Sequence, residues 1–138
     1  MKRTIALLTV LITASLALPV LAASQPLPDL TITKVTVAKK TVKGKAKLLV
    51  TYSVKNIGSA PAAASVTKIS VQGAGLASGE QTCPPLKPNE VRQTSWTCDI
   101  SRAGKYKINV GADYYNAITE TNKMNNQNQI SFGFSRPF

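Results

Sequence analysis

The chain has 138 residues and a formal net charge of +11, from 17 Lys and Arg against 6 Asp and Glu. It contains no His, so the commonest general base and a common metal ligand are missing. The carboxylates lie far apart along the expected strands, and no glycine-rich phosphate loop opens a helix. The six carboxylates are Asp29, Glu80, Glu90, Asp99, Asp113 and Glu120. We therefore expect no enzymatic activity, no cofactor and no metal site.

The N-terminal segment has the pattern of a cleaved secretory signal peptide. Two basic residues precede an apolar stretch over 5–18, and small residues after Pro19 permit cleavage after Ala22 or Ala23. A membrane anchor is the alternative, but a spanning helix needs about 20 apolar residues without a helix breaker. We predict that residues 1–23 are removed on export. The protein is then periplasmic or secreted, and not transmembrane.

The remaining chain is strongly basic. Removing the predicted signal leaves about 115 residues, enough for one domain with a single core. Two of the 17 basic residues lie in that signal, which leaves 15 basic against 6 acidic residues and a net charge of +9. Six lysines crowd into a short segment: Lys34, Lys39, Lys40, Lys43, Lys45 and Lys47. We expect a basic hairpin there, either as a binding site for an anionic surface or as a solvated surface without a partner.

Two cysteines, Cys83 and Cys98, remain after the predicted cleavage. In an oxidising compartment an even pair indicates a disulfide, and two Cys without any His lack the ligands for a zinc site. The 14 residues between them would form a loop whose closure contributes about 3 kcal/mol to stability. The prediction is a disulfide between Cys83 and Cys98.

Short β-branched stretches separated by turn residues follow a Pro-containing leader at 24–28, which is typical of an all-β domain. In 47–55 and 105–112 apolar residues alternate with polar ones, as in strands with one buried face. Further strands are expected at 30–37, 66–71, 91–100 and around 130–134. A glycine-rich loop is expected over 72–79. Six or seven strands in about a hundred residues predict an immunoglobulin-like antiparallel sandwich of two sheets over 29–138.

The most polar segment, residues 113–126, lies between the last two expected strands. Its Asp, Glu and Asn side chains are expected to bind backbone groups in turns, which gives them a structural role. These residues are Asp113, Asn116, Glu120, Asn122, Asn125 and Asn126. Calcium ligation by the carboxylates and by Asn122, Asn125 and Asn126 is the alternative, but the spacing does not match the helix-loop-helix calcium pattern. Tyr114 and Tyr115 would point to opposite faces of an extended chain, and an exposed Tyr indicates a contact surface.

Several segments together form a recognisable set. They are Pro28-Asp-Leu-Thr-Ile, Val50-Thr-Tyr-Ser-Val-Lys-Asn-Ile-Gly58, Ala60-Pro61-Ala62, Leu86-Lys-Pro-Asn-Glu90, Gly104-Lys-Tyr-Lys-Ile and Ala112-Asp-Tyr-Tyr-Asn-Ala-Ile-Thr-Glu-Thr-Asn-Lys-Met-Asn-Asn126. This set resembles the CARDB domain, the cell-adhesion-related domain of bacterial envelope and surface proteins. The resemblance implies an immunoglobulin-like fold and a role in adhesion or binding, without a defined ligand. Two departures are Lys123, where the family usually has an acid, and the cysteine pair, which is not a family hallmark.

The sequence therefore predicts an exported, non-catalytic binding or adhesion module that recognises a protein or glycan of the envelope or exterior. The alternative is a cationic protein that binds lipopolysaccharide, acidic glycan or DNA through the basic hairpin, without specific nucleic acid recognition. Binding that weakens steeply with salt would favour the second function, because it indicates release of counterions.

Overall fold

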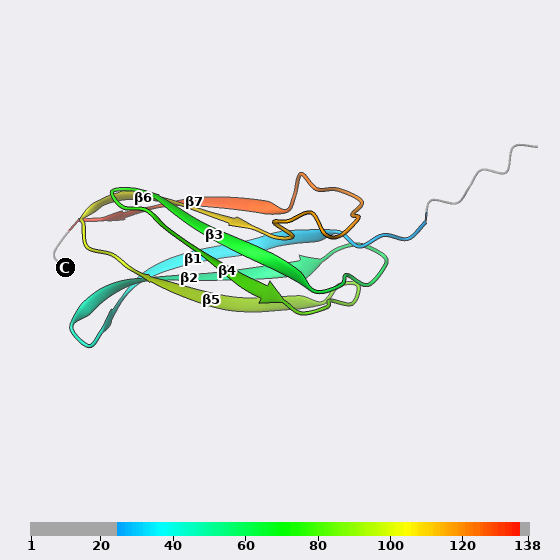
Figure 1. The fold of residues 1–138 in the computed structure, drawn as a ribbon, viewed down its shortest axis with the longest axis horizontal. Helices are drawn as coiled ribbons and strands as arrows, with labels where there is room; N and C mark the ends of the chain where they lie inside the picture. Colours follow the sequence, from blue (N-terminus) through cyan, green and yellow to red (C-terminus); the bar gives the residue numbers. More distant parts are fainter. Residues whose placement is uncertain (1–24, 136–138) are drawn as a thin grey trace, which may run out of the picture.

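The computed structural model describes residues 25–135, which form seven strands and no helix. The strands are β1 (Leu30–Val42), β2 (Lys45–Asn56), β3 (Ser65–Gly73), β4 (Ala77–Cys83), β5 (Val91–Asp99), β6 (Gly104–Gly111) and β7 (Gln127–Phe134). Antiparallel pairing gives one sheet of order β1-β2-β5 and a second of order β4-β3-β6-β7 (Figure 1). The predicted immunoglobulin-like sandwich is confirmed. The predicted signal peptide lies outside the described residues, and within 25–135 no helix could cross a membrane.

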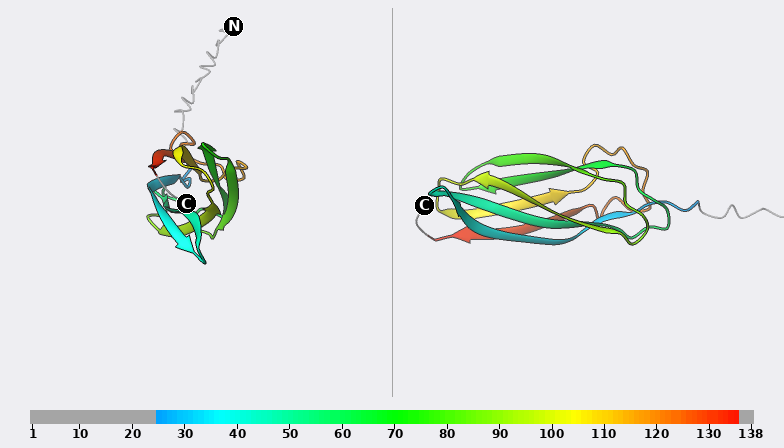
Figure 2. Two further views of the ribbon diagram at one scale, coloured as in Figure 1. Left: turned by 90° about the vertical axis from the view of Figure 1, so that its left-hand side faces the viewer. Right: turned by 90° about the horizontal axis from the view of Figure 1, so that it is seen from below.

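The two sheets pack face to face (Figure 2). Alternate residues of each strand point inward, because successive side chains of a strand lie on opposite faces. Leu48 and Val50 of β2 are fully buried against Ile69 of β3 and against Ile108 and Val110 of β6 in one apolar core. The alternation predicted for β2 and β6 is therefore confirmed. The core makes the sandwich a rigid support for the loops at its two ends.

Strand β4 differs from the prediction, which placed a glycine-rich loop there. Its sequence lacks β-branched alternation, and it is an edge strand that pairs only with β3 among the described residues. Gly79 lies opposite Ile69, and a Cβ at Gly79 would overlap the indole ring of Trp96. The glycine that suggests a loop in the sequence instead provides space for the Trp96 ring, which packs against the core.

Strands β1 and β2 are longer than predicted, and their hairpin extends beyond the sandwich at the lower left of Figure 1. Val42 pairs with Lys45, so Lys43 and Gly44 form a two-residue turn. Their φ angles are 50° and 74°. Positive φ at both central residues is the geometry that matches the twist of the flanking strands. The predicted basic hairpin is present, with Lys43 at its tip.

The predicted disulfide is wrong, because Cys83 and Cys98 are both free thiols. Cys83 ends β4 opposite Ser65, whereas Cys98 lies opposite Leu48, toward the other end of the sandwich. Arg92 lies near Cys83, since its charge affects the pKa of that thiol. Arg92 precedes Cys98 by six positions on β5, and six residues of extended strand span about 20 Å. A disulfide requires Cα atoms within about 7 Å. Burial raises the pKa of both thiols, which makes them less reactive at neutral pH.

Candidate functional site

The predicted site residues fall into two groups at opposite ends of the sandwich. The tip of the basic hairpin (residues 34–47) lies at one end, and the β6–β7 loop (residues 112–126) lies at the other, in orange in Figure 1. The β6–β7 loop lies beside the start of β1, where the Thr121 amide donates to the Pro28 carbonyl at 3.0 Å. The two groups therefore form separate surfaces.

Asp113 organises the first half of the β6–β7 loop. Its side chain is buried, and its backbone has a φ of 44°. One carboxylate oxygen accepts from the Ala117 amide at 2.9 Å, and the other accepts from the Ile118 amide at 3.1 Å. Asp is among the residues that tolerate positive φ and bind nearby amides, so the sequence has a local reason to turn here.

Tyr114 and Tyr115 both lie on the surface, with 46% and 60% of their area exposed. They occupy the centre of a turn in which the Asn116 amide donates to the Asp113 carbonyl at 3.0 Å. The extended chain expected from the sequence would have separated them, whereas this turn brings them together on one side. Their rings pack edge to face, with centroids 5.1 Å apart and an interplanar angle of 82°.

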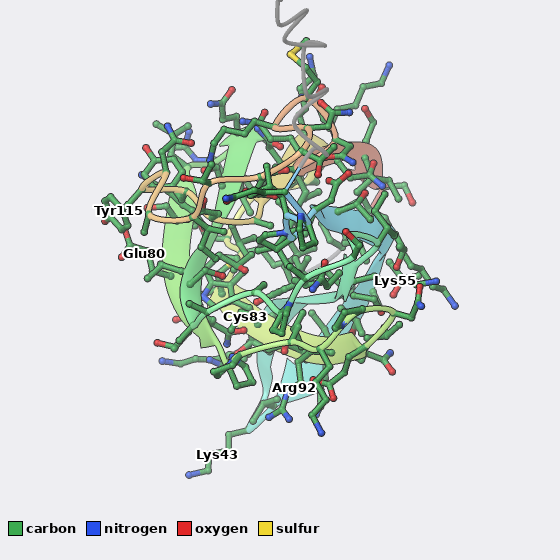
Figure 3. The ribbon with its side chains drawn as sticks, turned by 90° about the vertical axis from the view of Figure 1, so that its right-hand side faces the viewer. Lys43, Lys55, Glu80, Cys83, Arg92 and Tyr115 are labelled. Carbon is green, nitrogen blue, oxygen red and sulfur yellow. The ribbon has the colours of Figure 1, made fainter. Side chains whose placement is uncertain are left out.

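Two charged side chains hold these rings in place. The Lys68 ammonium lies 4.3 Å from the centroid of the Tyr114 ring and donates to its hydroxyl at 3.2 Å. The Tyr115 hydroxyl donates to Glu80 at 2.5 Å, which raises the pKa of Tyr115, and Figure 3 shows these two side chains together. Lys68 and Glu80 are cross-strand partners on β3 and β4. We call Lys68, Glu80, Tyr114 and Tyr115 the aromatic patch.

The second half of the β6–β7 loop fastens the start of β1. Glu120 accepts from the Leu30 amide and from the Asn126 side chain, both at 2.7 Å. The Asn125 side chain donates to Asp29 at 2.9 Å. Burial raises the pKa of Glu120, and these hydrogen bonds partly offset that effect. The polar side chains thus join two segments that are far apart in the sequence.

The oxygen ligands considered for calcium do not converge as a set. The Asn122 side chain accepts from the Met124 amide at 2.9 Å, in a local turn. Between the two buried carboxylates lies the ammonium of Lys123, 3.2 Å from Asp113 and 3.6 Å from Glu120. Among residues 25–135, no group of three or more His, Cys, Asp or Glu is placed to hold a metal ion.

The register of β1 and β2 divides the six lysines of the basic hairpin. Lys39 lies opposite the inward-facing Leu48, and Lys43 is at the tip. The other four lie on the outer face of the β1-β2-β5 sheet. Lys55 lies on the same face, further along β2 toward the opposite end. We call this group the basic face: Lys34, Lys40, Lys45, Lys47 and Lys55.

Like charges meet within the basic face. Lys40 and Lys47 are direct cross-strand partners, an arrangement that destabilises a sheet. On its other side Lys47 donates to Asp99 at 2.7 Å, and this hydrogen bond lowers the pKa of Asp99. The ion pair relieves part of the repulsion between the two lysines, but the surrounding face keeps an excess of positive charge.

The sequence patterns did not single out Lys68, Glu80 or Lys123 as site residues. Lys68 and Glu80 come from strands that are distant in sequence from the two tyrosines, so no local pattern connects them. Lys123 was noted only as a departure from the CARDB pattern. Its spacing of three residues from Glu120 was the available sign of an ion pair.

Comparison with known proteins identifies the family. The CARDB family model matches residues 27–130. The crystal structure of the CARDB domain of the PF1109 protein from Pyrococcus furiosus, described as a complex with di-metal ions, is 25% identical with a TM-score of 0.59. The match covers 78% of this chain and 93% of that chain. The solution NMR structure of the same domain is 24% identical with a TM-score of 0.57, covering 78% of this chain and 94% of that chain.

A β-glucosidase from Erythrobacter marinus is 14% identical with a TM-score of 0.54, over 77% of this chain and 15% of the enzyme. This likeness shows a common fold alone. Among curated proteins, no sequence matches this chain significantly. The family model covers most of the described residues, and the seven strands form the expected sandwich. The chain belongs to the CARDB family.

Proposed function

We propose that the chain is an exported, non-catalytic binding module that recognises a protein or glycan of the cell envelope or exterior through the aromatic patch. CARDB membership supports a binding role in general. Export rests on the signal pattern of residues 1–23. The observation that carries the proposal is the exposed Tyr114–Tyr115 pair, held in a defined position at one end of a rigid sandwich.

The geometry of the aromatic patch suits recognition. About half of the surface of each Tyr residue is exposed to solvent, yet contacts to Lys68 and Glu80 already restrict both side chains. Restricting a side chain before binding reduces the conformational entropy lost in the complex. Tyr also combines a large apolar ring with a polar hydroxyl, which suits both protein surfaces and sugar rings.

Binding to immobilised glycans and to purified envelope components should require the two tyrosines. We expect the double variant Tyr114→Ala/Tyr115→Ala to lose at least about tenfold in affinity, because aromatic anchors contribute much of an interface's binding energy. The variant should melt close to the wild type, since both side chains are exposed. Leu76→Ala serves as the matched control, because it removes another exposed apolar side chain, in the loop just before β4. Equal affinity of the double variant and the wild type would contradict the aromatic patch as the binding surface.

A second candidate function is polyanion binding through the basic face. The observation that favours it is the direct pairing of Lys40 with Lys47, which costs stability and is therefore unexpected on a surface that serves solubility alone. The tip of the hairpin also projects beyond the sandwich (Figure 1), so an extended polyanion could reach Lys43 and the lysines next to it from several sides.

Heparin chromatography tests this second function. The triple variant Lys34→Gln/Lys40→Gln/Lys45→Gln should elute at clearly lower salt, because it loses contacts to the anionic groups of heparin. Each lost contact to a phosphate or sulfate lowers the slope of log K against log salt concentration by about one. The control with the same change in net charge is a triple Gln variant of three exposed lysines outside the basic face: Lys87, Lys105 and Lys107. Equal elution of both triple variants would show that net charge, and not the basic face, governs retention.

A further inference from the structure

A cleft opens between the two sheets at the hairpin end of the sandwich, where the β3–β4 turn (residues 74–76) and the β5–β6 loop (residues 100–103) lie (Figure 1). Its volume is about 480 Å³. Small-molecule sites in proteins typically measure about 300–1,000 Å³ and combine an apolar interior with a few polar groups. The cleft therefore has the size of a small-molecule site.

The interior of the cleft is apolar. Val71 of β3, Ile100 of the β5–β6 loop and Tyr106 of β6 are buried and line it. Ala77 and Cys98 also line it, and both are partly buried against the core of the sandwich. Burial raises the pKa of the Cys98 thiol, so this side chain is uncharged at neutral pH and acts as a small apolar group. Such an interior favours the apolar part of a ligand, because binding removes apolar surface from water.

Hydrogen bonds fix the two loops that form the walls of the cleft. The Ala74 amide donates to the Lys105 carbonyl at 3.0 Å, which holds the β3–β4 turn against β6. The Tyr106 hydroxyl donates to the Arg102 carbonyl at 2.6 Å, which holds the β5–β6 loop against the same strand. The cleft is thus preformed, and a preformed site loses less conformational entropy when a ligand binds.

The mouth of the cleft has an excess of positive charge. Asp99 and Arg102 line the cleft and are exposed. The Asp99 carboxylate already forms an ion pair with Lys47 at 2.7 Å, and the charge of Lys45 also acts on it. The Arg102 guanidinium has no ion-pair partner among residues 25–135. A guanidinium presents several N–H donors in a plane that matches a carboxylate, so the charge still available at the mouth suits an anion.

We propose that this cleft binds a small amphipathic anion, whose apolar body lies in the interior and whose acidic group binds Arg102. A cation with the same apolar body should bind poorly, because it would face the charge of Arg102. An alkyl carboxylic acid and an aromatic carboxylic acid both have the required chemistry. The cleft and the aromatic patch lie at opposite ends of the sandwich. The inference therefore does not rest on the proposed function, and either can fail alone.

Protection of Cys98 from alkylation by iodoacetamide measures occupancy of the cleft, because the thiol lines it. Mass spectrometry of the digested protein follows Cys98 and Cys83 separately, and Cys83, which is buried toward the other end, is the internal control. The probes are decanoate, naphthoate and decyltrimethylammonium, which has the same alkyl chain as decanoate with the opposite charge. We expect at least one acid to slow alkylation of Cys98 several-fold and saturably, without an effect on Cys83. Protection by decanoate alone identifies an alkyl acid as the ligand class, and protection by naphthoate alone identifies an aromatic acid.

Two pairs of variants test the two halves of the site. Arg102→Gln should bind the acid about tenfold more weakly, because it loses a charge-assisted hydrogen bond. Lys87→Gln makes the same change in net charge at an exposed position outside the cleft and should bind as the wild type does. Ala77→Phe fills the interior, so Cys98 should react slowly with and without the acid. Ser78→Phe adds the same ring at an exposed position of β4 and should leave the protection unchanged.

Three results would overturn the inference. They are a failure of both acids to protect Cys98, equal protection by decyltrimethylammonium, and equal affinity of Arg102→Gln and the wild type for the acid. Arg102→Gln changes an exposed side chain and should melt at the temperature of the wild type. The test of the anion site therefore does not depend on whether Ala77→Phe folds.

Discussion

Asn56→Ala is expected to destabilise the fold by about 3–5 kcal/mol, because it leaves several buried backbone groups without partners. Asn56 is fully buried at the end of β2. Its side-chain oxygen accepts from the amides of Asp29 and Gly58, both at 3.0 Å. Its side-chain nitrogen donates to the carbonyls of Ala60 at 2.8 Å and Leu86 at 3.1 Å. One side chain therefore connects the chain before β1, the turn after β2 and the segment before β5.

Denaturant unfolding followed by Trp96 fluorescence measures this effect. The control is Asn109→Ala, which removes the same side chain from the outer face of β6 and should change stability by less than about 0.5 kcal/mol. Asn56→Asp should also be strongly destabilising, because a carboxylate cannot donate to the Ala60 and Leu86 carbonyls. A loss below about 1 kcal/mol for Asn56→Ala would show that water or a local shift satisfies these backbone groups.

Gly58→Ala is expected to cost about 2–4 kcal/mol, at the upper end of what overpacking produces. A Cβ at Gly58 would lie 2.5 Å from the Asp29 nitrogen and 2.6 Å from the Pro28 carbonyl carbon, and it would also overlap the Leu27 carbonyl oxygen. All three are backbone atoms, so no side-chain rotation can make room. The two segments are also held together, since the Ile57 amide donates to the Asp29 carbonyl at 2.8 Å.

Gly133→Ala is the matched control for this substitution. A Cβ at Gly133 meets no atom within 4 Å, and Gly133 lies in strand β7. This variant should be neutral or slightly stabilising, because Ala loses less backbone entropy on folding than Gly. Melting curves of the two Ala variants measure the difference directly. Equal melting temperatures would mean that residues 27–29 move away from the turn without loss.

The sequence predicted the inward-facing residues of the strands well, because burial on one face makes apolar residues recur at every second position. Leu48, Val50, Ile108 and Val110 were assigned to the inward face from alternation alone, and all are fully buried. Turns were also predictable from the local sequence. Asp113 and Asn116 were expected to form turns, and both adopt positive φ in the β6–β7 loop. Such features depend on residues within a few positions of one another.

The predictions that failed concerned relations between distant segments. The disulfide was inferred from compartment and number of cysteines, but β4 and β5 place Cys83 and Cys98 far apart on opposite halves of the sandwich. Strand β4 has no local signal of its own, and pairing with β3 forms it. The side-by-side tyrosines depend on a turn that an extended-chain interpretation could not include.

The sequence by itself determined the fold class, the basic hairpin and the turn-forming character of residues 113–126, because periodicity, charge density and Asx chemistry are local properties. Only the tertiary structure decided which lysines share the basic face, which side chains hold the two tyrosines, and which oxygens surround Lys123. Those groupings join β1 with β2, β3 with β4 and the two halves of the β6–β7 loop. Their physical cause is the pairing register of the sheets, which brings together residues that are distant in the sequence.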